Sequence, residues 1–519
     1  MKLSKSVMFG AAACLLSTSA SAQAAGDLLA LSQYNYSFST ARSAALGGAF
    51  TSLGADLSSM SINPAGLGMY MSSDFGISPS LTWNNMQSTY LGTKSDYSRT
   101  RFTLGNLGMA FNLYQGSGTL TSFTLGVGYS KLADFNTTSA AYGQGIDKSI
   151  TDVLAEYMNG VPLSSLGHPD NDPYQPFRRA DVGLWGGILA YQTGILDPMS
   201  DAQDNKQYTV ANNLATGSRI NPSMRNVNKG SIDEYSISGG FNIQNILYLG
   251  FTIGIQDILY RNDNYYAETY DNNPLPLNGM NYIRSLHLDG TGVNFKFGAV
   301  VRPVENLRIG VAVHTPTLVS INEEYIEWMS ADYKNTARGE LLDSPRSLNE
   351  YDINTPTRLL TGISYTLPGV GLITADYERV WYNRMKLRNM GTENWDFQQT
   401  INNEVSSFYQ PANNFRVGIE ATPAQNFYIR AGYANYGECI ATRDAFNNMS
   451  SINSYENYSA GLGFRFQNMY VDLAYIYTEY KYAPYTMFYY GDPDYVVNPG
   501  NVETKQNRNT ITMSVGVRF

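Results

Sequence analysis

Apolar and polar residues alternate along much of the chain from Asp74 onward, and this alternation is the main structural signal in the sequence. A period of two residues is that of a β-strand, because successive side chains of a strand point to opposite faces. In residues 508–519 one face is apolar and the other carries mainly small polar residues. A membrane-spanning barrel strand has this pattern, since one face meets lipid and the other meets the lumen.

Fourteen segments of this kind predict an all-β fold, a 14-stranded antiparallel transmembrane β-barrel within residues 74–519. They span residues 74–83, 99–113, 119–132, 231–244, 246–261, 290–303, 306–320, 355–367, 370–384, 412–423, 426–436, 456–467, 469–482 and 508–519. An even number of strands returns both ends of the barrel chain to the same side of the membrane.

The connections between these segments alternate between long and short. The long ones are 84–98, 133–230, 262–289, 321–354, 385–411, 437–455 and 483–507, and the others have at most a few residues. Long extracellular loops and short periplasmic turns are expected of an outer-membrane barrel. The largest connection, 133–230, should carry its own structure, with a helix over 150–158. It either binds ligand or only caps the barrel.

Residues 1–22 have the features of a secretory signal peptide, namely early lysines, an apolar stretch and small residues before the end. A lipoprotein would need acylation at Cys14, but Ala11 stands where a leucine is usual. We expect cleavage before Gln23. Cys439 is then the single cysteine of the mature chain, which excludes an intramolecular disulfide.

The composition fits one large barrel and excludes several other classes. The chain has 519 residues with 40 Tyr, 47 Gly and only 15% charged residues, which suits a barrel with aromatic girdles. A formal net charge of -9 argues against a nucleic-acid partner. No mature segment has the roughly 18 uninterrupted apolar residues of a membrane helix.

Residues 23–73 do not alternate like a strand. A stretch of small residues over 41–50 is followed by the turn sequence Asn63-Pro64-Ala65-Gly66. In this order the chain resembles the FadL family of outer-membrane transporters for long-chain fatty acids and other hydrophobic compounds. In that family an N-terminal hatch carrying Asn-Pro-Ala plugs the barrel, so the resemblance implies that 23–73 is a hatch with these four residues at a hatch or ligand position.

The resemblance also implies a function and partners. Hydrophobic ligand would diffuse inward from a loop groove to a lumenal pocket, and hatch movement would open a path, partly sideways through a kinked third strand; no cofactor is implied. Gly126 and Gly128 are the candidates for that kink, although they could equally make room inside. The expected surroundings are lipopolysaccharide and outer-membrane lipid, with a monomer that the barrel assembly machinery recognises through a strand ending in Phe519.

The alternation also places charged residues inside the barrel. On 306–320 it directs Arg308 and His314 to the lumen, and it does the same for Arg302, Arg430, Arg465 and Arg518. The five arginines lie near short turns or the C-terminus, hence in the periplasmic half. Buried cations need partners. These would be a ligand carboxylate or, more simply, the acids Asp56, Asp376, Glu378, Glu420 and Asp472.

Other functions find less support in the sequence. The histidines, His168, His287 and His314, have no flanking pattern of a nucleophilic enzyme, so catalysis is not expected. Asp170 and Asp172 have the spacing of a calcium loop without its glycine and closing glutamate, so no metal site is predicted, although an ion could bridge acidic loops and lipopolysaccharide. Two alternatives stay open: a general porin, which needs no hatch, and an adhesin or structural barrel.

Overall fold

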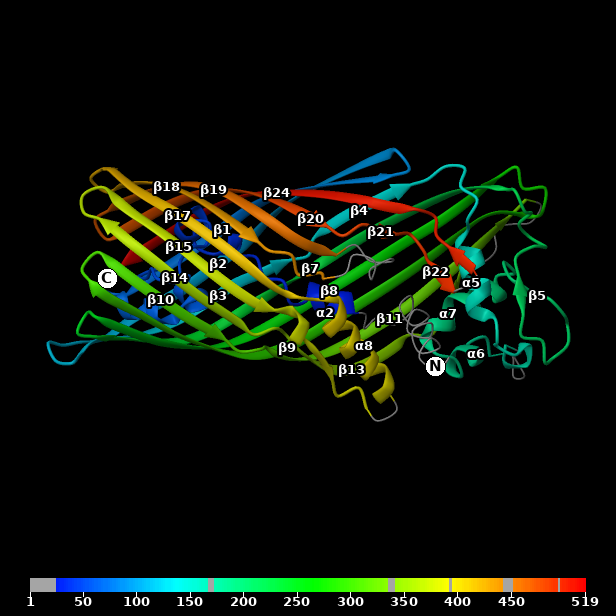
Figure 1. The fold of residues 1–519 in the computed structure, drawn as a ribbon, viewed down its shortest axis with the longest axis horizontal. Coiled ribbons are helices and arrows are strands. Elements are labelled where there is room, and N and C mark those ends of the chain that lie inside the picture. The colour runs from blue at the N-terminus through cyan, green and yellow to red at the C-terminus, as the bar shows by residue number, and fades with distance from the viewer. Residues whose placement is uncertain (1–24, 167–171, 335–340, 392–393, 442–450, 493–494) are drawn as a thin grey trace, which may run out of the picture.

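A computed structural model describes residues 25–519 except 167–171, 335–340, 392–393, 442–450 and 493–494. The expected signal peptide with Cys14, and also His168 and Asp170, lie outside the described residues. The chain forms a closed antiparallel barrel of 14 strands, which confirms the prediction from alternation (Figure 1).

Some barrel strands consist of two successive elements. The wall is formed, in chain order, by β1 (Asp74–Tyr90), β2 (Thr93–Gln115), β3 (Leu120–Asp134) with β4 (Thr137–Tyr142), β7 (Arg219–Ile243), β8 (Leu247–Asp271), β9 (Leu277–Val304), β10 (Leu307–His314) with β11 (Leu318–Tyr333), β13 (Ser347–Asn354) with β14 (Arg358–Leu367), β15 (Gly371–Trp381) with β16 (Lys386–Arg388), β17 (Pro411–Ala424), β18 (Phe427–Tyr436), β19 (Ile452–Phe466), β20 (Met469–Tyr482) and β24 (Asn501–Arg518). β24 pairs with β1 from Asp74↔Arg518 to Tyr90↔Val502, and this pairing closes the barrel.

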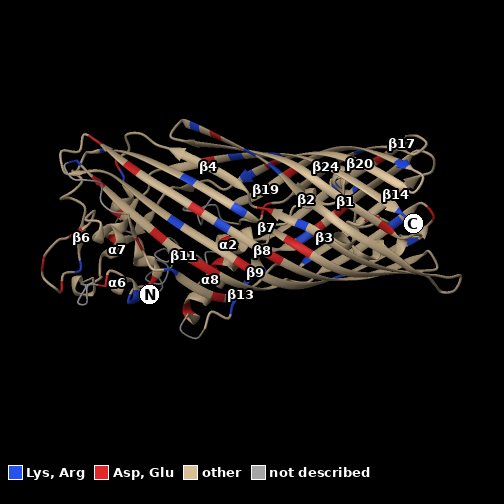
Figure 2. Cartoon of the chain, turned by 180° about the vertical axis from the view of Figure 1, so that it is seen from behind, with Lys and Arg blue, Asp and Glu red and all other residues tan. Residues whose placement is uncertain are grey.

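The outer surface of the wall carries an apolar band. On β10, Ile309, Val311 and Val313 are 48%, 42% and 40% exposed, whereas Ala312 between them is 1% exposed. So many exposed apolar side chains are unfavourable in water, and this face therefore meets the membrane interior. Figure 2 shows long strand stretches without charged residues on the half that carries the C-terminus. Among the described residues, no helix is long and apolar enough to cross a membrane.

The strands extend well beyond the predicted segments at the end of the barrel opposite the C-terminus, which we call the loop end. The predicted connection 84–98 is a hairpin that turns at residues 91–92, and β8 and β9 occupy most of 262–289. The prediction was wrong here because strand residues above the membrane have polar neighbours on both faces. Apolar alternation stops there, although the backbone ladder continues.

The predicted connection 133–230 carries a helical cap at the loop end. It contains α5 (Ile150–Met158), η3 (Leu163–Ser165), α6 (Gln175–Arg178), η4 (Val182–Leu184), α7 (Trp185–Gln192) and the short strands β5 (Asp197–Pro198) and β6 (Tyr208–Thr209). α5 begins as predicted, at a capping box between Ser149 and Asp152. Burial raises the pKa of the Asp152 carboxyl, and the Ser149 N–H opposes this shift. Leu154, Met158 and Leu189 of α5 and α7 are buried in the cap.

Smaller elements complete the loop end of the barrel. α8 (Trp395–Phe408) and η5 (Tyr382–Arg384) flank β16, and the short strands are β12 (Leu342–Asp343), β21 (Tyr485–Thr486), β22 (Tyr490–Asp492) and β23 (Tyr495–Val497).

Residues 25–73, which we call the interior segment, lie inside the barrel (blue in Figure 1). They form α2 (Ala25–Ala30), η1 (Tyr36–Phe38), α3 (Ala41–Ala45), α4 (Ser59–Ile62) and η2 (Pro64–Met69). Almost all of residues 41–68 are buried, including polar ones such as Ser43 and Asn63. The wall and this segment therefore share one packed interior.

Glycines on the inner face of the wall make room for the interior segment. A Cβ at Gly298 of β9 would lie 1.8 Å from the Asn63 Oδ1, and one at Gly250 of β8 would lie 2.2 Å from the Pro64 carbonyl carbon. Similar close approaches to the segment occur at Gly310, Gly362, Gly418, Gly432 and Gly461. Only a residue without a side chain allows the two backbones to approach this closely.

Replacing Gly298 by valine should therefore destabilise the protein by about 1–3 kcal/mol, the usual cost of overpacking. The measurement is the temperature at which the folded, fast-migrating form is lost on a gel. Val301→Leu, on the outer face of β9, is the control and should be neutral. In a chain lacking residues 25–66 the cost of Gly298→Val should disappear; a cost that persists would mean that the glycine serves the wall alone.

Candidate functional site: the lumenal cavity

A cavity of about 310 Å³ lies in the lumen between the cap and the interior segment. On the cap side it is lined by α5 and residues near α7, and on the other side by α2 and residues 33–35. Apolar side chains such as Leu29, Val153, Leu154 and Phe488 contribute to its surface. Ten tyrosines also line it: Tyr34, Tyr157, Tyr260, Tyr282, Tyr325, Tyr455, Tyr480, Tyr482, Tyr485 and Tyr489. A largely apolar and aromatic surface with a few polar groups is typical of a small-molecule site.

Residues 32–35, which we call the strap, cross the lumen at the base of the cavity. Arg358 of β14 donates a hydrogen bond to the Ser32 carbonyl at 2.6 Å, and the Tyr455 hydroxyl of β19 donates one to the Tyr34 carbonyl at 2.7 Å. The Asn35 side-chain amide donates to the Tyr480 hydroxyl of β20 at 2.9 Å. The Arg358 guanidinium also lies 4.0 Å from the centre of the Tyr34 ring. The strap is thus bonded to three strands of the wall, β14, β19 and β20.

Buried ion pairs surround the lumen near the strap. Glu378 lies between two arginines, at 3.4 Å from Arg358 Nη1 and 3.1 Å from Arg416 Nη1, and all three side chains are at most 4% exposed. Lys296 and Glu234 form another buried pair across β9 and β7. Arg416 is not among the residues predicted to be lumenal, although it lies on the same strand face as Glu420 and follows the same alternation.

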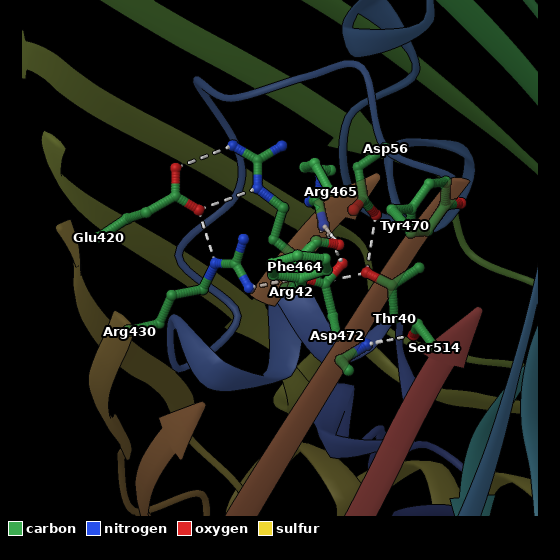
Figure 3. A network of polar contacts seen from close by, with 12 residues as sticks. Thr40, Arg42, Asp56, Glu420, Arg430, Phe464, Arg465, Tyr470, Asp472 and Ser514 are labelled. Carbon is green, nitrogen blue, oxygen red and sulfur yellow. Dashed lines mark hydrogen bonds and ion pairs between the residues drawn. The ribbon is translucent and has the colours of Figure 1, made fainter. Parts of the chain in front are cut away.

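A second polar network lies near the C-terminal end, where Figure 3 shows it. Glu420 Oε2 is 3.2 Å from Arg42 Nε of the interior segment and 2.5 Å from Arg430 Nε of the wall. Arg430 Nη1 and Arg465 Nη1 lie 2.6 Å and 3.0 Å from Asp472 Oδ1. The network therefore joins α3 to β17, β18, β19 and β20.

The remaining predicted lumenal residues have different roles. Arg518 donates a hydrogen bond to the Ala55 carbonyl at 3.2 Å, and His314 Nε2 donates one to the Ile62 carbonyl at 2.9 Å, so both hold the interior segment. Arg302 lies on the inner face but contacts Glu305 of its own turn. Arg308 forms no ion pair with any described carboxylate. Asp56 accepts hydrogen bonds from Thr40 and Ser58 and does not pair with an arginine among the described residues.

The Asn63-Pro64-Ala65-Gly66 turn lies against the wall. The Asn63 carboxamide oxygen accepts from the Ala65 N–H at 3.1 Å, and its amide donates to the Thr51 carbonyl at 2.6 Å. The same amide lies 3.4 Å from the carbonyls of Ala299 in β9 and Val311 in β10. Pro64 occupies the first turn of η2, where its fixed φ is favourable. A Cβ at Gly66 would lie 2.5 Å from Ser59 Oγ, so this position is tightly packed.

The third wall strand is irregular, but not at the predicted glycines. β3 pairs continuously with β2 and β7 through Gly126 and Gly128, and a Cβ at either would lie within 3 Å of Met60. These glycines therefore make room for the interior segment, and both ladders are unbroken at them. Opposite β7 the register of β3 shifts between Leu120 and Ser122 and again between Lys131 and Ala133.

At the shift between Lys131 and Ala133 the wall is hydrogen-bonded to the strap, and the backbone pairing of β3 with β2 has ended. The Leu132 carbonyl accepts a hydrogen bond from the Asn35 N–H at 2.7 Å, so it points inward. The β2–β3 ladder ends at Asn106↔Ser130, and in the described residues beyond it neither β3 nor β4 forms a ladder with β2. Side-chain contacts such as Tyr97 OH to Tyr142 OH at 3.1 Å bridge this stretch, which we call the side seam.

The described residues contain no group of three or more His, Cys, Asp or Glu side chains that could hold a metal ion. The groups that the cavity offers for binding are aromatic rings, amides, guanidinium groups and the carboxylates of Asp27 and Asp134.

Comparison with known proteins shows similarity in fold. No family model and no curated protein matches the chain. The toluene transporter TodX of P. putida superposes with a TM-score of 0.51 at 12% identity, covering 94% of this chain and 99% of TodX. A FadL homologue of Pseudomonas aeruginosa gives a TM-score of 0.51 at 11% identity, covering 93% and 98%. The chain therefore has the fold of these barrels over nearly its whole length, and a closed barrel with an apolar outer band is the architecture of outer-membrane proteins.

Replacing Glu420 by glutamine should lower the free energy of unfolding by about 3–5 kcal/mol, because two arginines would lose their shared carboxylate in a buried site. Equilibrium unfolding of the purified protein in urea measures the change. Glu456→Gln is the matched control: its partner Lys481 is 58% exposed, and such surface pairs contribute about 0–1 kcal/mol. Equal losses for the two variants would contradict a stabilising role for the network.

Proposed function

We propose that the protein takes up hydrophobic or amphipathic small molecules, such as long-chain fatty acids, across the outer membrane by passive diffusion. The observation that carries this proposal is the tyrosine-lined cavity between the cap and the interior segment. The names of the two similar structures, a toluene transporter and a FadL homologue, agree with a hydrophobic cargo. The packed interior segment argues against a general porin, which needs an open aqueous lumen.

In this proposal the interior segment acts as the hatch. Ligand enters beside α5, whose Val153 and Leu154 line the cavity, and rests against the tyrosines. The strap then has to move, because its backbone is bonded to the wall on several sides. Polar contacts suit a part that moves, since water can replace their hydrogen bonds at small net cost.

The side seam supports a sideways exit. Moving the strap breaks the hydrogen bond between the Asn35 N–H and the Leu132 carbonyl. That carbonyl lies at the register shift of β3 between Lys131 and Ala133, where the strand has no ladder with β2. Displacement of the strap by ligand would thus loosen the wall where its backbone pairing is already incomplete. No reaction and no cofactor are involved.

Filling the cavity tests the route. Val153→Trp should reduce uptake of a radiolabelled fatty acid several-fold, because the indole would occupy the space next to the tyrosines. Uptake is measured in cells and in liposomes with the purified protein. Val127→Trp, on the outer face of β3 where Val127 is 38% exposed, should leave uptake unchanged. A folded Val153→Trp protein that transports normally would exclude the cavity from the route.

Removing residues 25–66 tests the hatch. The barrel should still assemble, because its strands pair with one another, and the emptied lumen should conduct ions in planar bilayers and admit bulky antibiotics into cells. The full-length protein is the control. A folded deletion protein as impermeable as its parent would show that residues 25–66 do not block the lumen.

A further inference from the structure

Polar side chains from β7, β8, β9 and β24 line part of the cavity, and the acids Asp27 and Asp134 line it as well. We call the polar residues of these four strands the polar arc; its members are Asn228, Asn262, Asn264, Arg284, Gln506 and Arg508. The apolar and aromatic residues of α2 and α5 line the cavity as well. The cavity therefore presents two chemically different surfaces to a ligand.

The side-chain amides of the polar arc have donors and acceptors that their hydrogen bonds within the protein do not use. Asn262 donates to the Asn228 oxygen at 2.6 Å, Asn228 donates to Thr137 Oγ1 at 3.0 Å, and Arg284 donates to the Asn264 oxygen at 3.1 Å. Each carboxamide has two N–H donors and two acceptor lone pairs, so these contacts use only part of them. A pure hydrocarbon would remove water from these groups without replacing its hydrogen bonds, which is unfavourable.

Arg508 is one of the two arginines of the polar arc, and the other is Arg284. Arg508 is 5% exposed, yet no described carboxylate lies within ion-pair distance of it. Its Nη2 donates to the Asp134 carbonyl at 3.1 Å, and its guanidinium carbon lies 5.3 Å and 5.7 Å from the centres of the Tyr480 and Phe38 rings. Its Nε is buried without a hydrogen-bond partner. Arg416 and Arg430, elsewhere in the lumen, are each paired with acids. A buried guanidinium without an acid fits an acidic group of a ligand, because a planar fork of donors matches a carboxylate.

We infer that the cavity selects acidic amphiphiles whose hydrocarbon part also carries hydroxyl or amide groups. The acid group binds at Arg508, the hydroxyl or amide groups bind the asparagines of the polar arc, and the hydrocarbon packs on the tyrosines. This inference rests on the proposed function and makes its ligand specific. A simple fatty acid satisfies Arg508 but leaves the asparagines without partners, and an alcohol of the same length leaves Arg508 without one.

The experiment compares probes of equal length on the full-length protein in nanodiscs. Binding of dodecanoate, 1-dodecanol and a series of hydroxydodecanoates with the hydroxyl at different carbons is measured by calorimetry. At least one hydroxydodecanoate should bind about tenfold more tightly than dodecanoate, which corresponds to one net hydrogen bond. Hydroxydodecanoates that all bind no better than dodecanoate would overturn the inference, while binding and uptake of dodecanoate would leave the proposed function standing.

Two variants test the contacts of the hydroxyl group and of the acid group separately. The double variant Asn228→Leu, Asn262→Leu should bind hydroxydodecanoates no more tightly than dodecanoate and should keep its affinity for dodecanoate. Arg508→Met should lower the affinity for dodecanoate and for the hydroxydodecanoates, but not the affinity for 1-dodecanol. Asn509→Leu, on the outer face of β24, is the control and should change nothing. An unchanged hydroxyl advantage in the folded double variant would overturn the inference. If no probe binds and none is taken up by cells, both the inference and the proposed function fail.

Discussion

In lipid, every backbone N–H and C=O of a membrane-spanning wall has to find a partner within the protein. Closure through the β1–β24 ladder meets this requirement and at the same time creates a lumen that has to be filled. The interior segment fills it, and the inward glycines allow its backbone to touch the wall. The side seam departs from this full backbone pairing, since β2 and β3 have no ladder there. It lies next to Leu132, to which the strap is hydrogen-bonded.

Polar contacts, rather than a continuous apolar core, hold much of the interior segment. Arg42, His314, Arg358 and Arg518 each connect it to the wall or take part in a network that does. Buried charges are costly without partners, so these contacts specify one position of the segment. The same contacts leave a separate cavity toward the cap, where Arg508 has no described acid to pair with. The lumen is thus divided into a densely packed part around the interior segment and a part that contains the cavity.

Features that depend on local periodicity could be predicted from the order of the residues. Alternation separates Ile309, Val311 and Val313 from Gly310 and Ala312, because adjacent residues of a strand always face opposite sides. It therefore predicted the barrel, its number of strands, and which face of β10 carries His314. The helix at 150–158 was also predictable, since its apolar spacing and capping box are local.

Features that depend on which strands meet could not be predicted in this way. The extra length of β7, β8 and β9, the position of the irregularity in β3, and the cavity all arise from contacts between residues far apart in sequence. Gly126 and Gly128 show the difference: a glycine in a strand is compatible with a kink or with close packing, and only the structure shows that Met60 packs against both. Likewise, alternation directs Arg430 and Arg508 inward by the same local rule, but their neighbours across the lumen determine that one meets two acids and the other meets none that the structure describes.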